Sequence, residues 1–301
     1  MVETVLLAHD FSPSSERALA YAVDVAQRSG AALHLMHVDQ TAEGVLFEGG
    51  QAPPSDELQE RFEDRCRTSL APHPLSPGDE QVACHAVRGV APAPLLVEKA
   101  QALGADLLVT GTEGRRGARR LIVGSVAEEI LRTAPCPVLT VREQDDADEG
   151  SPYVEVEKVI APVDFSERTE TALQYVSQLS SLYDAPVQLM HVVEDASLPS
   201  VYEAKSSKVQ ARAAEDRAEA ELQSLGEPLV SQGVSVSTLV RRGETTDTVV
   251  QATGEPGTLT VMGTRGLSGV QRIMLGSVTE AVIRASSGPV LAARISPSDA
   301  D

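Results

Sequence analysis

The chain has no tryptophan, and aromatic residues make up only 3% of its 301 residues. Its cores must therefore be built from aliphatic side chains, and a hydrophobic content of 42% is sufficient for that. No apolar run reaches the length of a transmembrane helix, and the start, MVETVLLAHD, lacks the basic region of a signal peptide. We therefore expect a cytoplasmic protein that does not bind membranes.

Cysteine and lysine are also scarce. Cys66, Cys84 and Cys136 are far apart in the sequence and form no C-x-x-C pair, which argues against a zinc site or a disulfide framework. The formal net charge is −19, and a surface of that sign repels phosphate backbones. We expect neither nucleic-acid binding nor a metal site built from protein ligands.

One glycine pattern occurs twice, beginning at Gly111 and at Gly263. Each copy follows an apolar run typical of a buried strand, reads Gly-x2-Gly-x9-Gly-Ser, and precedes a helical pattern. Glycines let a backbone approach a ligand closely, and a helix that begins at the Gly-Ser pair directs N–H groups and its positive end there. The pattern is suited to bind a di- or triphosphate. The alternative is a strand-to-helix loop that binds nothing.

The repeat extends over the whole chain. Asp164 follows Asp10 by 154 residues, and Gly276 follows Gly124 by 152. Two copies of one domain explain this register better than a solenoid of short repeats. We predict domain 1 over residues 1–143, an acidic linker over 144–155 and domain 2 over 156–301.

Within each half, strand and helix patterns alternate as βαβαβαβαβ. This alternation predicts an α/β fold with a five-stranded parallel sheet and helices on both faces. We expect the sheet to be doubly wound, with the strand order 3-2-1-4-5. Ser12 and Ser166 should cap the first helix of each half. The second helix of domain 2 is expected over Val201 to Leu225.

A doubly wound sheet binds ligands at the carboxyl ends of its strands, where the winding direction reverses. That point brings Asp164, after the first strand of domain 2, opposite Met262 and Gly263 at the end of the fourth. A carboxylate there can accept hydrogen bonds from ribose hydroxyls or an adenine amino group. The alternative role for Asp164 is to stabilise the helix dipole.

The repeated glycine pattern after the fourth strand resembles the ATP-binding signature of the universal stress protein family. The resemblance covers nearly the whole chain as two tandem, Rossmann-like domains. It implies that ATP binds in domain 2, together with Mg²⁺, at Asp164, Val192, Met262, Gly263, Arg265, Gly266, Gly276, Ser277 and Val278. In domain 1 it implies the matching residues Asp10, Val38, Thr110, Gly111, Gly114, Gly124, Ser125 and Val126.

Domain 1 departs from the family pattern at Glu113, where the family usually carries His or Arg and domain 2 has Arg265. A carboxylate near phosphates should weaken binding. A basic cluster in the same loop either compensates or is solvated and paired with nearby acids; it comprises Arg115, Arg116, Arg119 and Arg120. Domain 2 is thus the favoured ATP site.

Other candidate residues have plainer interpretations. His37 and His191 recur at equivalent strand ends, where a histidine usually bonds to a backbone group, and His9 has no counterpart, so we assign it no role. Cys136 is interpreted as a small core residue. The chain has no GxxxxGK[ST], HExxH or GxSxG motif and no evident catalytic base.

The leading hypothesis is an ATP-binding stress-response module with slow hydrolysis at most. The alternatives are a slow ATPase or nucleotidyl-transfer enzyme of a related fold, and a dimerisation scaffold that binds no nucleotide. The resemblance also implies assembly through the last strand of each domain, which would pair the two domains within one chain as a pseudo-dimer. It also allows a homodimer.

Overall fold

The computed structural model describes residues 2–40, 55–112, 123–142, 154–194, 205–264 and 275–294. These residues form two compact units, each described separately: the described residues of 1–155 fall in the first, and those of 156–264 and 276–294 in the second. The predicted linker lies mostly outside the described residues, and so do Glu113, Gly114, Arg265 and Gly266.

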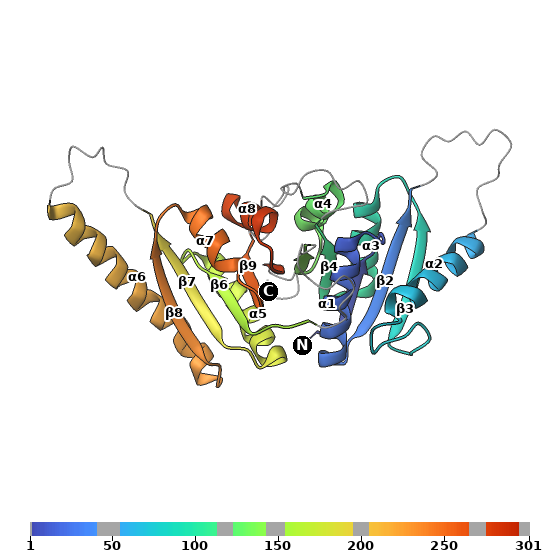
Figure 1. Ribbon diagram of the computed structural model, residues 1–301, viewed down its shortest axis with the longest axis horizontal. Helices are drawn as coiled ribbons and strands as arrows, with labels where there is room; N and C mark the ends of the chain where they lie inside the picture. Colours follow the sequence, from blue (N-terminus) through green and yellow to red (C-terminus); the bar gives the residue numbers. More distant parts are fainter. Residues whose placement is uncertain are drawn as a thin grey trace. The chain divides into compact units, whose positions relative to one another are not determined.

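The first unit alternates strands and helices without interruption (Figure 1). Its elements are β1 (Thr4–Ala8), α1 (Pro13–Ser29), β2 (Ala32–Asp39), α2 (Ser55–Leu70), β3 (Val82–Arg88), α3 (Pro92–Leu103), β4 (Leu107–Gly111), α4 (Ser125–Thr133) and β5 (Val138–Val141). All the strand pairs are parallel, and their order is β3-β2-β1-β4-β5.

The second unit has the same sequence of elements. They are β6 (Lys158–Pro162), α5 (Glu167–Tyr183), β7 (Val187–Val193), α6 (Lys205–Ser231), β8 (Val236–Arg242), α7 (Thr245–Thr253), β9 (Thr258–Gly263), α8 (Ser277–Ala285) and β10 (Val290–Ala293). Its parallel order is β8-β7-β6-β9-β10. The prediction of two doubly wound parallel sheets of order 3-2-1-4-5 is therefore confirmed.

Helices cover both faces of each sheet, because right-handed crossovers on either side of the central strand place successive helices on opposite faces. The largest fully buried side chains are leucine, isoleucine and methionine, for example Leu6, Leu108 and Ile160. The cores are thus aliphatic, as the shortage of aromatic residues predicts. None of the helices in the described ranges combines the length and hydrophobicity that a bilayer span requires.

Helix ends follow the expected local signals in most places. Ser12 is the N-cap of α1 and accepts a hydrogen bond from the backbone N–H of Ser15, and Gly30 ends the helix in the left-handed conformation at φ 73°. Gly124 and Gly276 immediately precede α4 and α8. In each unit a helix therefore begins directly after the last glycine of the pattern that follows β4 or β9.

The prediction for α6 is wrong at its C-terminal end. The helix runs through Gly226 and Pro228 and ends at Ser231. Leu222 and Leu229 are buried, and their spacing puts them on the same helix face as Gly226. A Cβ at Gly226 would lie 3.1 Å from Val236 Cγ1, so this glycine lets the helix approach the sheet instead of ending it.

The extra burial explains why α6 tolerates a proline. Pro228 removes one backbone donor in the last turn, whereas continuing the helix buries Leu229 to 3% exposure. The stop comes at Gly233, which has φ 88°. The N–H of Val234 then bonds to the carbonyl of Leu229, the closing bond of a Schellman motif.

Substituting Leu229 tests this continuation. We expect Leu229→Ala to lower the free energy of unfolding by about 2–5 kcal/mol, the usual cost of truncating a fully buried leucine. Val230→Ala is the matched control, because Val230 is 57% exposed and should change stability by no more than about 0.5 kcal/mol. Urea unfolding gives both values, and equal effects would show that the last turn does not pack on the sheet.

Candidate functional site

The same backbone feature follows the first strand of both units. Asp10 and Asp164 are each followed by a phenylalanine in the left-handed region, Phe11 at φ 62° and Phe165 at φ 56°. Bulky residues rarely adopt this conformation, and strain of this kind persists only where the surroundings enforce it. Packing against a histidine of the second strand supplies that enforcement: the Phe165 and His191 ring centroids lie 4.4 Å apart.

Each of these histidines bonds to the backbone just before the aspartate. His37 Nδ1 lies 2.8 Å from the carbonyl oxygen of His9, and His191 Nδ1 lies 2.8 Å from that of Val163. The interpretation of His37 and His191 as partners of backbone groups is therefore confirmed. Their function is to fix the turn that carries the aspartate.

The second unit contains a pocket of about 400 Å³ at the carboxyl ends of β6, β7 and β9. Every described residue of the predicted domain 2 site lines it: Asp164, Val192, Met262, Gly263, Gly276, Ser277 and Val278. The other two predicted residues, Arg265 and Gly266, lie outside the described residues. The topology thus brings together side chains separated by more than a hundred positions in the sequence.

One wall of the pocket is a strand edge without a partner strand. β6 ends at Pro162, which pairs with Met190, whereas β7 continues to Val193. The carbonyl of Met190 faces β6, because it accepts the N–H of Val163. The N–H and C=O of Val192, two residues on, point the same way. They extend beyond the end of β6 and are directed into the pocket.

The remainder of the pocket combines an apolar wall with polar groups at two ends. Val163, Ala172, Met190 and Val249 form apolar parts of the lining. At one end α8 begins at Ser277, so the first N–H groups of that helix lack intrahelical acceptors and its positive end faces the cavity.

The other end is acidic. Ser166 donates from both its N–H and its hydroxyl to Asp164 Oδ1, at 3.2 and 2.5 Å. Ser166 is the N-cap residue of α5, as predicted, although its side chain makes no capping hydrogen bond to the helix. Across the rim, Thr245 donates its hydroxyl to Glu194 Oε1 at 2.7 Å.

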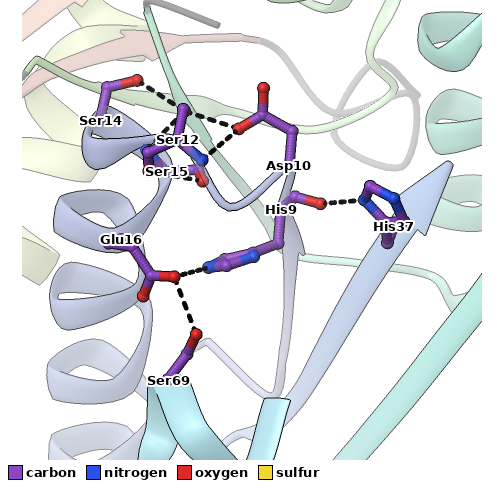
Figure 2. A network of polar contacts seen from close by, with 8 residues as sticks. All are labelled: His9, Asp10, Ser12, Ser14, Ser15, Glu16, His37 and Ser69. Atoms are coloured by element: carbon purple, nitrogen blue, oxygen red, sulfur yellow. Dashed lines mark hydrogen bonds and ion pairs between the residues drawn. The ribbon is translucent and has the colours of Figure 1, made fainter. Parts of the chain in front are cut away.

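The first unit has the same contact between the aspartate and the following serine. Asp10 is half-buried and accepts hydrogen bonds from the N–H and hydroxyl of Ser12, at 3.0 and 2.6 Å (Figure 2). Burial acts to raise the pKa of Asp10, but the hydrogen bonds from Ser12 and Ser15 outweigh it and hold the pKa below its ordinary value. The carboxylate is therefore held ionised within a serine cluster.

The end of β4 in the first unit is packed against α1. A Cβ added at Gly111 would lie 2.6 Å from Ser14 Oγ and 2.9 Å from the backbone nitrogen of Ser15. Thr110, beside it, is buried. The corresponding Met262 and Gly263 of the second unit instead line the pocket.

The other predicted residues of domain 1 lie where the fold predicts. Val38 on β2 pairs with Val87 on β3. It lies two residues after Met36, which pairs with the last residue of β1, so Val38 extends beyond the end of β1. Gly124 donates its N–H to the carbonyl of Thr112, and α4 begins at Ser125 with Val126 in its first turn. Gly114 is outside the described residues.

His9 is a polar residue to which sequence analysis assigned no role. It is 3% exposed, and its Nε2 lies 3.7 Å from Glu16 Oε1, which also accepts the hydroxyl of Ser69 at 2.8 Å (Figure 2). Burial acts to raise the pKa of Glu16, but the contacts with His9 and Ser69 lower it overall. The second unit has Val163 at the position that corresponds to His9. This difference in sequence indicates that the network is specific to the first unit.

The described residues contain no group of three or more His, Cys, Asp or Glu side chains placed to hold a metal ion.

The fold and the pocket of the second unit define a tandem α/β protein with a ligand-sized cavity at a strand switch point of that unit. The model of the universal stress protein family matches residues 1–142 and 155–294, and the chain belongs to that family. It matches the family twice, which confirms the tandem organisation.

Two relatives illustrate single-domain and tandem forms. A universal stress protein of Thermus aquaticus is 33% identical over 142 residues, which are 47% of this chain and 100% of that protein. The crystal structure of a universal stress protein from Archaeoglobus fulgidus has a TM-score of 0.63 at 19% identity and covers 98% of this chain and 97% of its own. At that identity the likeness shows the fold alone.

A further solved universal stress protein was crystallised in complex with cAMP. It is 27% identical and covers 48% of this chain and 98% of its own, with a TM-score of 0.34.

The serine cluster of the first unit gives a pH-dependent prediction. Ser12→Ala should raise the pKa of Asp10 toward its ordinary value and, by removing the cap of α1, lower stability by about 0.5–2 kcal/mol near neutral pH. Because the folded pKa of Asp10 lies below the unfolded one, its stabilisation is present above about pH 4 and lost as pH falls through the folded pKa.

The difference between Ser12→Ala and the wild type should therefore shrink in acid. Carboxyl NMR titration and urea unfolding at neutral and acidic pH measure the two effects. Ser166→Ala, the matched change in the second unit, should leave the titration of Asp10 unaltered. An Asp10 titration that does not respond to Ser12→Ala would show that the serine does not control it.

Proposed function

We propose that the protein is an ATP-binding universal stress protein whose working site is the pocket of the second unit. The observation that carries this proposal is the coincidence of that pocket with the predicted site. All seven predicted residues that fall in the described part line it. The volume of about 400 Å³ falls within the range of about 300–1,000 Å³ typical of small-molecule sites.

The lining suggests how a nucleotide would be oriented. An adenine ring fits between the apolar side chains, where the free edge of Val192 offers one donor and one acceptor to its polar edge. The Asp164 carboxylate is placed to accept hydrogen bonds from ribose hydroxyls. The phosphates would then lie toward the start of α8, where the Ser277 hydroxyl and unpaired N–H groups favour an anion.

The site is better suited to binding than to turnover. In the described lining, the acids Asp164 and Glu194 are engaged by hydroxyl donors. Mg²⁺ would be held mainly through the phosphates. We therefore infer a nucleotide-dependent regulatory role, with a slow ATPase as the alternative that a turnover assay with MgATP tests.

The two units should differ in function. In the first, Ser14 occupies the space beside Gly111, and the sequence has Glu113 where the second unit has Arg265. We therefore expect one ATP per chain, bound in the second unit.

A matched pair of substitutions tests both statements. Gly276 and Gly124 have nearly identical backbone angles, φ −62° and −59°, that valine adopts without strain. Gly276→Val puts a branched side chain into the pocket at the start of α8, and it should reduce ATP affinity at least about tenfold, a loss of about 1.4 kcal/mol. Gly124→Val should leave ATP binding unchanged.

Calorimetric titration and the nucleotide released on denaturation measure affinity and stoichiometry, with cAMP titrated in parallel. Unfolding temperatures of both variants check that they remain folded. Loss of ATP in Gly124→Val would move the site to the first unit. Absence of binding in the wild type would favour the scaffold hypothesis, and stronger binding of cAMP would change the assigned nucleotide.

A further inference from the structure

Helix α2 lies along β3, the outer strand of the first unit (Figure 1). The amide of Gln59 fastens the two elements together. Its nitrogen donates to the carbonyl of Cys84 at 2.8 Å, and its oxygen accepts the N–H of Ala86 at 2.9 Å. The relative position of α2 and β3 is thus fixed by two backbone contacts adjacent to a cysteine.

A second cysteine lies on the same face of α2. Cys66 is seven residues, or about two helical turns, beyond Gln59, so it also faces β3. Its side chain is fully buried, and one turn earlier Phe62 of α2 stacks on the ring of His37. Cys84 lies on the same face of the sheet as His37, because its partner on β2 is two residues before His37, so the fold places the two thiols next to each other. The two thiols are 18 positions apart in the sequence, so no C-x-x-C pattern reveals the pair.

The two thiols are not equivalent. Cys84 is only partly buried, and the hydrogen bond from Cys66 lowers its pKa. The charge of Arg67 lowers this pKa further, whereas burial and the charge of Glu63 raise it, and the net result is a lowered pKa. Donating that hydrogen bond, together with burial, raises the pKa of Cys66. Because the thiolate is the nucleophile, Cys84 is the more reactive sulfur and Cys66 is held protonated beside it.

We propose that Cys84 and Cys66 are a peroxide-oxidised thiol pair that closes to a reversible disulfide between β3 and α2. The placement of the two thiols next to each other, the fixed position of the two elements and the difference in exposure together support this assignment. The proposal does not depend on nucleotide binding, because both residues lie in the first unit and outside the pocket of the second.

The reaction balances with hydrogen peroxide as the oxidant. The Cys84 thiolate attacks one peroxide oxygen, the O–O bond breaks, and the departing hydroxide takes a proton to leave as water. The resulting sulfenic acid is attacked by the Cys66 sulfur, the S–O bond breaks, and that oxygen leaves as water with the Cys66 proton. Two thiols lose two electrons, and exchange with a dithiol reductant restores them.

The bond would act on a helix that touches the Asp10 turn. Phe62 and Arg65 of α2 both contact the ring of Phe11, Phe62 with centroids 5.7 Å apart and Arg65 with its guanidinium carbon 3.4 Å from the centroid. Oxidation would therefore fix the wall beside the strained residue that positions Asp10.

The first test uses the wild-type chain treated with hydrogen peroxide and then alkylated under denaturing conditions. We expect the reactive thiols to fall from three to one, an intact mass lower by two hydrogens, and a peptide in which Cys66 is linked to Cys84. Dithiothreitol should restore all three. Retention of all three thiols, oxygen addition without a cross-link, or a link to Cys136 would each overturn the proposal.

Substitutions separate the two roles. In Cys66→Ala the sulfenic acid of Cys84 should persist and be trapped by dimedone, whereas Cys84→Ala should yield no trapped adduct at Cys66. Cys136→Ala is the control and should form the disulfide as the wild type does. In the untreated native protein, Cys84 should react with iodoacetamide at least about tenfold faster than Cys66, and equal rates would refute the assignment of roles.

Discussion

The hydrogen bond from a second-strand histidine to the backbone at the end of the first strand is the contact on which both candidate sites depend. It holds the carbonyl of His9 or Val163, and the neighbouring phenylalanine packs on the same imidazole in a conformation that its own sterics disfavour. In the first unit Phe62 and Arg65 of α2 also contact the ring of Phe11. Without the histidine contact, the turn that carries each aspartate would lose the support that the two units share.

Each unit uses this shared frame differently. In the second unit, hydroxyl donors engage the acids at the pocket rim and leave a cavity between the strand ends and α8. In the first, a serine hydroxyl also engages Asp10, and the buried His9 lies beside Glu16. A duplicated domain can thus keep one turn geometry while the residues around that turn differ between its two copies.

Much of this arrangement could be predicted from the sequence because its signals are local. The alternation of strands and helices predicted the two parallel sheets, and the Gly-Ser pairs predicted the starts of α4 and α8. The end of α6 could not be predicted, because the burial of Leu229 on the sheet outweighs the local breakers Gly226 and Pro228. The contact between Cys66 and Cys84 depends on tertiary packing and has no local signature. The predicted residues Gly114, Arg265 and Gly266 lie outside the described residues, and their roles stay predictions.

Gln59 has a further consequence for the solubility of the chain. The Cys84 carbonyl and the Ala86 N–H that it engages belong to the outer strand of the first unit and point away from β2. They are among the groups that a further strand would use to join the sheet. A single side-chain amide therefore takes the place of that strand, so a segment of another molecule would have to displace Gln59 before it could extend the sheet into an aggregate.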